Sequence, residues 1–328
     1  MSTARELGIK SKLEALWGDD IAAARQAFDA VFAADCAFHF SHPVNDIAGC
    51  DAAWEAVYLP LRAALRHARR RDEVFIAGQN RRSVGGTWIA ALTHYVGTLA
   101  GPLFGITASN RLAFLRSGEF YRIEGDCIIE ARIILDLPDL MRQAGRDPFG
   151  GRLGTEMLFP GPATHDGILP GGDGTASLDL IEAMLGDLHV YDPKTGTSKG
   201  QTGVGGYWAD DMLWYGPGGI GSNYRWDGFT RDHRAPFLAA FPDRKGGNHY
   251  ARIGQGNYAA ISGWPSMTMT HTGDYLGVPA TRKALTLRVM DFYRCADGQI
   301  AENWVCLDYM DLMAQMGVDL IARSNALA

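Results

Sequence analysis

The sequence has little cysteine, no long apolar segment and no excess of basic charge. Its 328 residues include five cysteines without CxxC spacing, Cys36, Cys50, Cys127, Cys295 and Cys306, so we expect reduced and mostly buried thiols. No apolar run approaches the roughly 20 residues that span a bilayer, and the N-terminus lacks the apolar core of a secretion signal. The net charge of −6 gives no general attraction to nucleic acid or anionic membranes. We therefore expect a cytoplasmic protein.

Several motifs of catalysis and cofactor binding are also missing. GVGG (203–206) and GPGGIG (216–221) lack the strand–GxGxxG–helix context of a dinucleotide site, and neither is a P-loop. No GxSxG or Cys–His nucleophile motif occurs. His39 and His42 stand three residues apart without further ligands at a usual spacing, which argues against a metal site. The sequence thus predicts neither a cofactor nor a metal.

What the sequence does contain is a long internal repeat. Residues 120–145 (FYRIEGDCIIEARIILDLPDLMRQAG) and 292–317 (FYRCADGQIAENWVCLDYMDLMAQMG) align without a gap at an offset of 172, which pairs Asp136 with Asp308. Further back, ADCAFHF (34–40) matches ADDMLWY (209–215) more loosely. A repeat of this length is a whole domain and not a short solenoid unit. We therefore predict two tandem copies of one fold.

Each copy shows the same order of elements. Apolar residues at helical spacing predict two early helices, over 21–32 and 178–188, and two later ones, over 51–68 and 230–241. The basic run RHARRR (66–71) then fits the solvated end of a helix. The turn GQGN predicts a hairpin of 248–253 and 258–272, and short helices over 137–144 and 309–316 close the copies. Helices followed by antiparallel strands indicate an α+β fold, with domains at 1–150 and 177–328 and a Gly/Pro-rich linker at 151–176.

Three segments together resemble the SnoaL-like polyketide cyclases, or ester cyclases, of the nuclear transport factor 2-like superfamily: THTGDYLGVPATRK (270–283), FYRxxxGQIxENWxxxD (292–308) and DLMAQMG (311–317). The resemblance covers most of 200–317, and the first copy follows it at 101–145. It implies two tandem cone-shaped domains, each a curved antiparallel sheet wrapped around helices with a deep pocket. Relatives in this superfamily catalyse different reactions, so the fold does not fix the chemistry.

Asp308 is the residue that the resemblance marks for acid/base catalysis, because its counterpart in polyketide cyclases moves protons during an intramolecular aldol closure. Alternation along the strand puts Asp308 on one face with Trp304. A carboxyl beside an indole in a dry pocket should have a raised pKa. The alternative is that Asp308 caps the helix that follows it. The two uses compete for one side chain.

Other residues complete the predicted site. His271 and His249 are further catalytic candidates, and either of them or Trp264 could donate a hydrogen bond to an enolate oxygen. Flat rings suit a conjugated ligand, although a filled core also explains most of them, and the predicted substrate-binding residues are Trp214, Tyr215, His233, Tyr258, Trp264 and Trp304.

The first copy offers a second predicted pocket, with His39, Trp88, His94, Arg132 and Asp136. We expect Arg132 to pair with Asp136 and to lower its pKa, which opposes acid/base use. The second copy is therefore predicted to be the active one.

The sequence predicts a cofactor-free acid/base enzyme of lyase or isomerase type that acts on a small hydrophobic carbonyl compound by an aldol-type closure. A hydratase, dehydratase or isomerase in the same pocket, or a non-catalytic ligand-binding protein, are the alternatives. The expected partner is a small hydrophobic molecule, with no nucleic acid and no membrane. Pairing of sheets is expected either between two chains of a homodimer or between the two copies within one chain.

Overall fold

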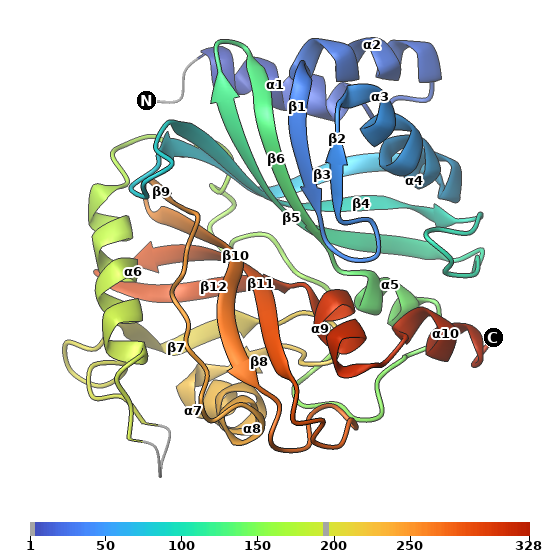
Figure 1. The fold of residues 1–328 in the computed structure, drawn as a ribbon. Coiled ribbons are helices and arrows are strands. Elements are labelled where there is room, and N and C mark those ends of the chain that lie inside the picture. Colours follow the sequence, from blue (N-terminus) through green and yellow to red (C-terminus); the bar gives the residue numbers. More distant parts are fainter. Residues whose placement is uncertain (1–3, 193–196) are drawn as a thin grey trace.

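The computed structural model describes residues 4–192 and 197–328 and shows two halves stacked on each other (Figure 1). Each half contains one six-stranded sheet, with the strand orders β2-β1-β6-β5-β4-β3 and β8-β7-β12-β11-β10-β9. In both sheets the first strand of the copy runs parallel to the last, and the other neighbours are antiparallel. The predicted α+β fold of two tandem domains is confirmed, each domain with one sheet and its own helices.

The N-terminal copy begins with two helices that pack on its sheet. Its elements are α1 (Ala4–Ala15), α2 (Ile21–Val31), β1 (Phe32–Phe40), β2 (Asp46–Ala48), α3 (Cys50–Ala53), the π-helix η1 (Trp54–Tyr58), α4 (Leu59–Ala64), β3 (Leu65–Gln79), β4 (Thr87–Leu99), β5 (Leu112–Glu124), β6 (Cys127–Leu135) and α5 (Leu137–Gln143). The carboxylate of Asp20 accepts hydrogen bonds from the first backbone N–H groups of α2, which fixes where that helix begins.

The C-terminal copy repeats this order with one leading helix. Its elements are α6 (Thr175–Leu188), β7 (Trp208–Tyr215), β8 (Asn223–Tyr224), α7 (Arg225–Phe229), the π-helix η2 (Thr230–Arg234), α8 (Ala235–Ala240), β9 (Ala251–Gln255), β10 (Tyr258–Thr270), β11 (Ala284–Ala296), β12 (Gln299–Leu307), α9 (Tyr309–Met316) and α10 (Leu320–Asn325). Among the described residues, no helix is long and apolar enough to cross a membrane.

The strand register shows which residues of the two copies are equivalent. Glu119 pairs with Ile133 in the hairpin β5–β6, and Asp291 pairs with Val305 in β11–β12, so the offset of the sequence repeat holds in this hairpin. The first strands differ from the loose sequence alignment by one position. Phe38 corresponds to Trp214, because the two lie opposite equivalent residues of β6 and β12.

The basic run at 66–71 is a strand and not the solvated helix end that the sequence predicted. α4 ends at Ala64, and β3 begins with Leu65. Arg70 points into the N-terminal cone, where its Nη2 lies 2.8 Å from Oδ1 of Asp72. The inward and outward alternation of this strand could not be recognised in the sequence. A buried arginine that is paired with carboxylates gives the same sequence pattern as an exposed arginine.

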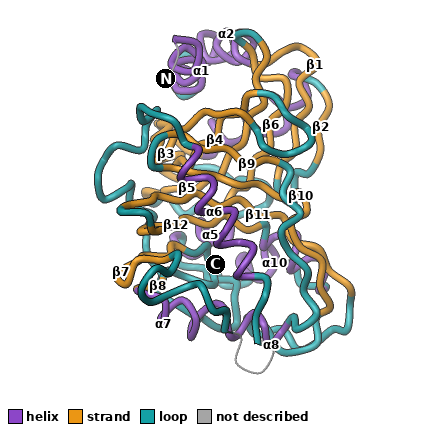
Figure 2. The backbone as a smooth tube through the Cα atoms, turned by 90° about the vertical axis from the view of Figure 1, so that its left-hand side faces the viewer, coloured by secondary structure: helices purple, strands orange, loops and turns teal. Residues whose placement is uncertain are grey.

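The two sheets pack face to face in the middle of the molecule. The helices cover their opposite faces, with α1 and α2 at one end and α7 and α8 at the other (Figures 1 and 2). Phe120 and Phe292, equivalent in the two copies, meet with ring centroids 5.8 Å apart. Around them lies an inter-sheet core of buried side chains from both copies, which includes Val74, Ile76, Trp88, Leu92, Ile253, Tyr258, Met290 and Trp304.

The segment between the copies closes one edge of this inter-sheet core. Phe159 is buried in it. Leu169 N–H donates to the Phe75 carbonyl over 2.6 Å, and Phe75 N–H donates to the Gly167 carbonyl over 2.8 Å, so this part of the segment adds a short parallel bridge to β3. The linker is therefore attached to the fold along its length.

The inter-sheet packing makes a quantitative prediction. Phe292→Ala should lower the free energy of unfolding by about 3–5 kcal/mol, because it empties a ring-sized space between the sheets. Leu112→Ala is the control, since Leu112 lies on a strand at 63% exposure, and it should change stability by less than about 0.5 kcal/mol. Urea denaturation of both variants measures the difference. A loss below about 1 kcal/mol at Phe292 would contradict a tightly packed inter-sheet core.

Candidate active site

The interior of the C-terminal cone contains a cavity of about 110 Å³. It lies between the helices α6 to α8 and the inner face of the sheet, and its apolar walls include Trp208, Trp214, Phe229, Ile261, Val289 and Leu307. A volume of this order compares with the roughly 150 Å³ cavity that holds benzene in an engineered protein core. The space therefore suits a ligand of about one ring.

Asp291 is the one carboxylate among the described residues that line this cavity. It lies on β11, whose residues point alternately to the two faces of the sheet. Val289, Asp291 and Tyr293 face the cavity, whereas Met290 and Phe292 enter the inter-sheet core. Opposite them on β12, Asn303, Val305 and Leu307 complete the cavity wall.

The surroundings of Asp291 favour its protonated form. Burial raises the pKa of Asp291 to about 7, against hydrogen bonds from Asn303 and Tyr293 that lower it. The Asn303 amide nitrogen lies 3.4 Å from Oδ1 of Asp291. In the part of the chain that the structure describes, no lysine or arginine lies within ion-pair distance of Asp291. A carboxyl with this pKa can accept and return a proton near neutral pH.

His249 offers a hydrogen-bond donor in the same cavity. Its Nδ1 lies 3.0 Å from Nε of Arg252, and because a guanidinium only donates, Nδ1 carries no proton. Burial, with the nearby Arg252 acting in the same direction, lowers the pKa of His249 to about 3. The ring is therefore neutral, with its proton on Nε2. Arg252 is held in turn by Glu182, at 3.0 Å.

A second neutral histidine belongs to the wall. His233 stacks on Trp214 with ring centroids 4.5 Å apart. Burial lowers the pKa of His233 to about 3, with Arg244 and Arg234 contributing in the same direction. His249, Trp214 and His233 are thus the predicted site residues that the structure brings to the cavity.

The equivalent position in the N-terminal cone is Glu119, and its carboxylate is fully engaged. Arg70 Nη1 donates to Oε2 over 2.7 Å, Tyr121 donates to the same oxygen over 2.5 Å, and the Ser117 hydroxyl lies 3.0 Å from Oε1. The Tyr95 hydroxyl donates to Oε1 as well. A carboxylate with these partners is poorly suited to remove a proton from a ligand.

Aromatic side chains occupy the space around Glu119. Trp17, which follows α1, packs on Tyr95 with centroids 4.3 Å apart. Phe28 of α2 contacts Tyr58 at 4.9 Å and Phe32 at 4.8 Å. All of these rings are buried. The interior of the N-terminal cone is thus packed with its own side chains.

Asp308 lies outside the cone cavity and caps α9. Its Oδ1 accepts the Asp311 N–H over 3.0 Å, and its Oδ2 accepts Arg288 Nη1 over 3.0 Å. The backbone N–H of His42, from the other copy, also donates to Oδ2, over 3.1 Å. Burial raises the pKa of Asp308 to about 6, as expected for a desolvated carboxyl. Of the two competing uses of Asp308, its geometry matches the cap.

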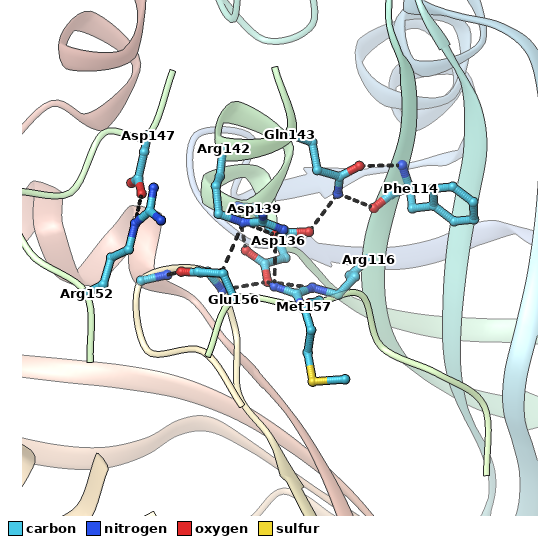
Figure 3. A network of polar contacts seen from close by, with 12 residues as sticks. Phe114, Arg116, Asp136, Asp139, Arg142, Gln143, Asp147, Arg152, Glu156 and Met157 are labelled. Atoms are coloured by element: carbon cyan, nitrogen blue, oxygen red, sulfur yellow. Dashed lines mark hydrogen bonds and ion pairs between the residues drawn. The ribbon is translucent and has the colours of Figure 1, made fainter. Parts of the chain in front are cut away.

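Asp136 repeats this arrangement in the N-terminal copy (Figure 3). It accepts the Asp139 N–H over 3.0 Å, Arg116 Nη2 over 2.6 Å and the Gly218 N–H of the other copy over 3.0 Å. The predicted pairing of Asp136 with Arg132 is wrong, because Arg132 lies 2.8 Å from Glu130 instead. In each copy, the aspartate that caps α5 or α9 therefore accepts a hydrogen bond from a backbone N–H of the other copy.

Most of the predicted aromatic residues face the other sheet. Tyr215, Tyr258 and Trp304 belong to the inter-sheet core, where Trp304 stacks on Tyr215 at 5.2 Å. Trp264 lies at the seam between the copies, with the guanidinium carbons of Arg288 and Arg132 at 4.9 and 5.6 Å from its ring. The prediction of a pocket at Trp304 and Trp264 is wrong, because strand alternation defines two faces without saying which of them is covered.

The remaining predicted residues do not share a cavity. His271 is buried against Phe241, and its Nδ1 accepts the Thr281 N–H over 3.2 Å. In the proposed second pocket, Trp88 lies in the inter-sheet core. His39 pairs with Asp46 over 2.8 Å. His94 Nδ1 lies 3.3 Å from Glu73.

Asp291, Tyr293 and Asn303 are among the polar cavity residues that the sequence analysis missed. One signal for Asp291 was present. It is an acidic residue in the middle of VMDFY (289–293), an otherwise apolar strand segment. A buried acid without a basic neighbour at strand spacing is a candidate for a perturbed pKa.

Comparisons with known proteins agree with this architecture. The family model described as SnoaL-like polyketide cyclase matches residues 199–316. The C-terminal copy is thus similar to SnoaL-like polyketide cyclases over these residues. No curated protein matches the sequence. The SnoaL-like match covers the strands that carry Trp214, Asp291 and Asn303.

Solved structures similar to the chain come from several bacteria. TsrD from Streptomyces laurentii is 18% identical, with a TM-score of 0.35, over 44% of this chain and 98% of its own. An NTF2-like protein from Burkholderia xenovorans LB400 is 11% identical, with a TM-score of 0.34, over 44% of this chain and 99% of its own. A protein with a ketosteroid isomerase-like fold from Catenulispora acidiphila, in complex with trimethylamine, is 16% identical, with a TM-score of 0.31, over 42% and 92%.

The cap assignment predicts that Asp308→Ala destabilises the protein by about 3 kcal/mol, because it removes a buried helix cap and leaves the half-buried Arg288 unpaired. Asp319→Ala is the matched control. Asp319 also caps a helix, by accepting the Ala322 N–H over 2.9 Å at an exposed position, and its loss should cost about 1 kcal/mol. Denaturant unfolding measures both losses. Equal losses of unfolding free energy in Asp308→Ala and Asp319→Ala would contradict the role of Asp308 in joining the copies.

The raised pKa of Asp291 predicts a pH-dependent gain in stability for Asp291→Asn. The folded state holds the Asp291 proton up to about pH 7, while the unfolded chain loses it near its ordinary pKa of about 4. Wild-type stability from this group is therefore present at low pH and is lost as the pH rises through 7. Asparagine carries no such penalty. The variant should gain about 2–3 kcal/mol over the wild type between about pH 5 and pH 8 in denaturant titrations, and a constant difference would contradict the raised pKa.

Proposed function

We propose that the C-terminal cone is a cofactor-free acid/base catalyst for a small carbonyl compound, with Asp291 as the group that moves the proton. The observation that carries the proposal is a lone carboxyl with a pKa of about 7 inside an apolar cavity. The SnoaL-like polyketide cyclase family supports an enzyme of lyase or isomerase type. Asp291 takes the role that the sequence analysis gave to Asp308.

The proposed step is removal of a proton from the carbon beside the substrate carbonyl. The Asp291 carboxylate takes the proton, the C–H electron pair forms the C=C bond of the enolate, and the carbonyl π pair moves to oxygen. The neutral His249 ring supplies an Nε2–H donor for that oxygen, in the place where the sequence analysis also considered His271 and Trp264. A preformed donor in a site of low dielectric stabilises the developing charge.

The fate of the enolate decides the overall reaction. If its carbon attacks a second carbonyl of the same molecule, the result is the aldol-type closure that the family name suggests. If protonated Asp291 returns the proton to another carbon, the result is an isomerisation. Both routes use the same first step. The cavity of about 110 Å³ favours a substrate of about one ring unless the α7–η2–α8 segment moves to admit a larger one.

Proton exchange tests the first step without knowledge of the natural substrate. The whole protein in D₂O should catalyse exchange of the α-protons of cyclohexanone, followed by NMR. The rate should rise with pH through an apparent pKa of about 7, because the base form of Asp291 is required. Asp291→Asn should reduce the catalysed rate by about 100-fold or more.

Asp308→Asn provides the matched control, because Asp308 is another acid whose pKa is raised by burial but it lies outside the cavity. It should retain exchange. Loss of exchange in Asp308→Asn with retention in Asp291→Asn would restore the sequence-based choice. An absence of wild-type exchange on one-ring ketones would overturn acid/base catalysis and leave a ligand-binding cavity.

A further inference from the structure

Arg252 links helix α6 to the histidine of the cavity. It lies on β9, the edge strand of the C-terminal sheet, between Ala251 and Ile253, which enter the inter-sheet core. Strand alternation therefore turns Arg252 to the opposite face. There its Nη1 lies 3.0 Å from Oε1 of Glu182 on α6, and its Nε donates to Nδ1 of His249 over 3.0 Å. One guanidinium is thus anchored to a helix and directed at a ring that lines the cavity.

The contact with Arg252 fixes how His249 presents its proton. Which nitrogen of a neutral imidazole carries the proton is set by the hydrogen bond that the other nitrogen makes. Because Nδ1 accepts from Arg252, the ring proton is on Nε2, and the ring cannot turn over without breaking this bond. A cationic donor on Nδ1 also withdraws electron density from the buried ring, which strengthens Nε2–H as a donor.

The backbone that carries these two side chains is held by the N-terminal copy. Oδ1 of the buried Asn80 accepts the Arg252 N–H over 3.0 Å, and the Asn80 amide nitrogen donates to the Tyr250 carbonyl over 3.3 Å. Arg82 Nε donates to the His249 carbonyl over 3.1 Å. Asn80 and Arg82 belong to the turn between β3 and β4. Hydrogen bonds from one copy therefore fix the segment of the other copy that presents the donor.

We propose that Arg252 and Asn80 are positioning residues for His249, so that the N-terminal copy takes part in the reaction of the C-terminal cone. This inference rests on the proposed function, because it concerns the donor to the enolate oxygen. Such a donor is effective when it is in place before the charge develops. Arg252 sets the direction and strength of Nε2–H, and Asn80 sets the position of the backbone that carries both side chains.

Arg252→Met tests the positioning role with two independent measurements. In the exchange of cyclohexanone protons, kcat should fall by at least about tenfold and KM should change by less than about twofold, since the donor acts on charge that develops in the transition state. NMR of the full chain labelled with ¹⁵N-histidine should show wild-type His249 with its proton on Nε2. In Arg252→Met, the two ring nitrogens should shift toward the average of both tautomers. His249→Gln assigns this signal among the nine histidines.

Arg81→Met is the matched control for Arg252→Met. It removes the same charge from a second partner of Glu182, since Arg81 Nη1 lies 3.1 Å from Oε2 of Glu182. The Arg81 side chain also contacts Asp179 and the Thr175 carbonyl, and none of these three partners lines the cavity. Arg81→Met should keep both kcat and the His249 signal of the wild type.

Asn80→Ala tests the contribution of the N-terminal copy. It removes the hydrogen bonds to Tyr250 and to the Arg252 backbone, so it should lower kcat by about threefold or more and shift the His249 signal. Asn80→Asp keeps an acceptor for the Arg252 N–H and should recover part of the loss. Circular dichroism shows whether each variant folds.

Unchanged kcat or an unchanged His249 signal in Arg252→Met would overturn the role of Arg252, as would equal effects in Arg81→Met. Wild-type kcat in Asn80→Ala would overturn the part of the N-terminal copy. If Arg252→Met does not fold, Arg252→Lys keeps a cation for Glu182 without the planar donor and should lower kcat several-fold. Absence of exchange in the wild type would overturn the proposed function, whereas the His249 signal in Arg252→Met decides the positioning role independently of turnover.

Discussion

The contact between the two sheets is the constraint on which the rest of the molecule depends. Because the outer faces of both sheets are buried against each other, residues such as Trp304 and Phe292 are core residues. The inner face of each sheet is then the remaining place for a cavity. In β11 this single fact puts Asp291 inside the C-terminal cone and Met290 outside it. The same contact brings the loop of one copy to the closing helix of the other, where Asp308 and Asp136 receive backbone donors.

The two copies show what the same fold does with and without an open interior. Both have an acid at the same place on the same strand, Glu119 and Asp291. In the N-terminal copy, Arg70 and three hydroxyl groups hold the acid, and rings from α2 and the segment after α1 fill the space. In the C-terminal copy the acid has an amide and a phenol beside it and faces a cavity. The chemical difference between the copies lies in these neighbours and not in the fold.

Much of the architecture could be predicted from sequence, because a gapless repeat of domain length and a helix-then-strand order are both local patterns. The site could be predicted only in part. Alternation along β12 predicts that Trp304 and Asn303 lie on opposite faces of the sheet. Which of these faces packs against the other sheet depends on the tertiary structure and cannot be predicted from the alternation. Arg70 was predicted to be a solvated charge for the same reason, because its partner Glu119 lies far along the chain and the sequence does not show that the two residues meet. Asp308 matched a family motif and has a raised pKa, yet its hydrogen bonds are those of a helix cap.

Joining both sheets in one polypeptide has a consequence for how the protein can diverge. In an assembly of identical chains, every substitution appears in both halves, so an interior cannot be filled on one side and kept hollow on the other. A fused pair escapes this symmetry. One half can specialise as a rigid scaffold that shields its neighbour, while the neighbour keeps a desolvated acid that would weaken a smaller protein standing alone.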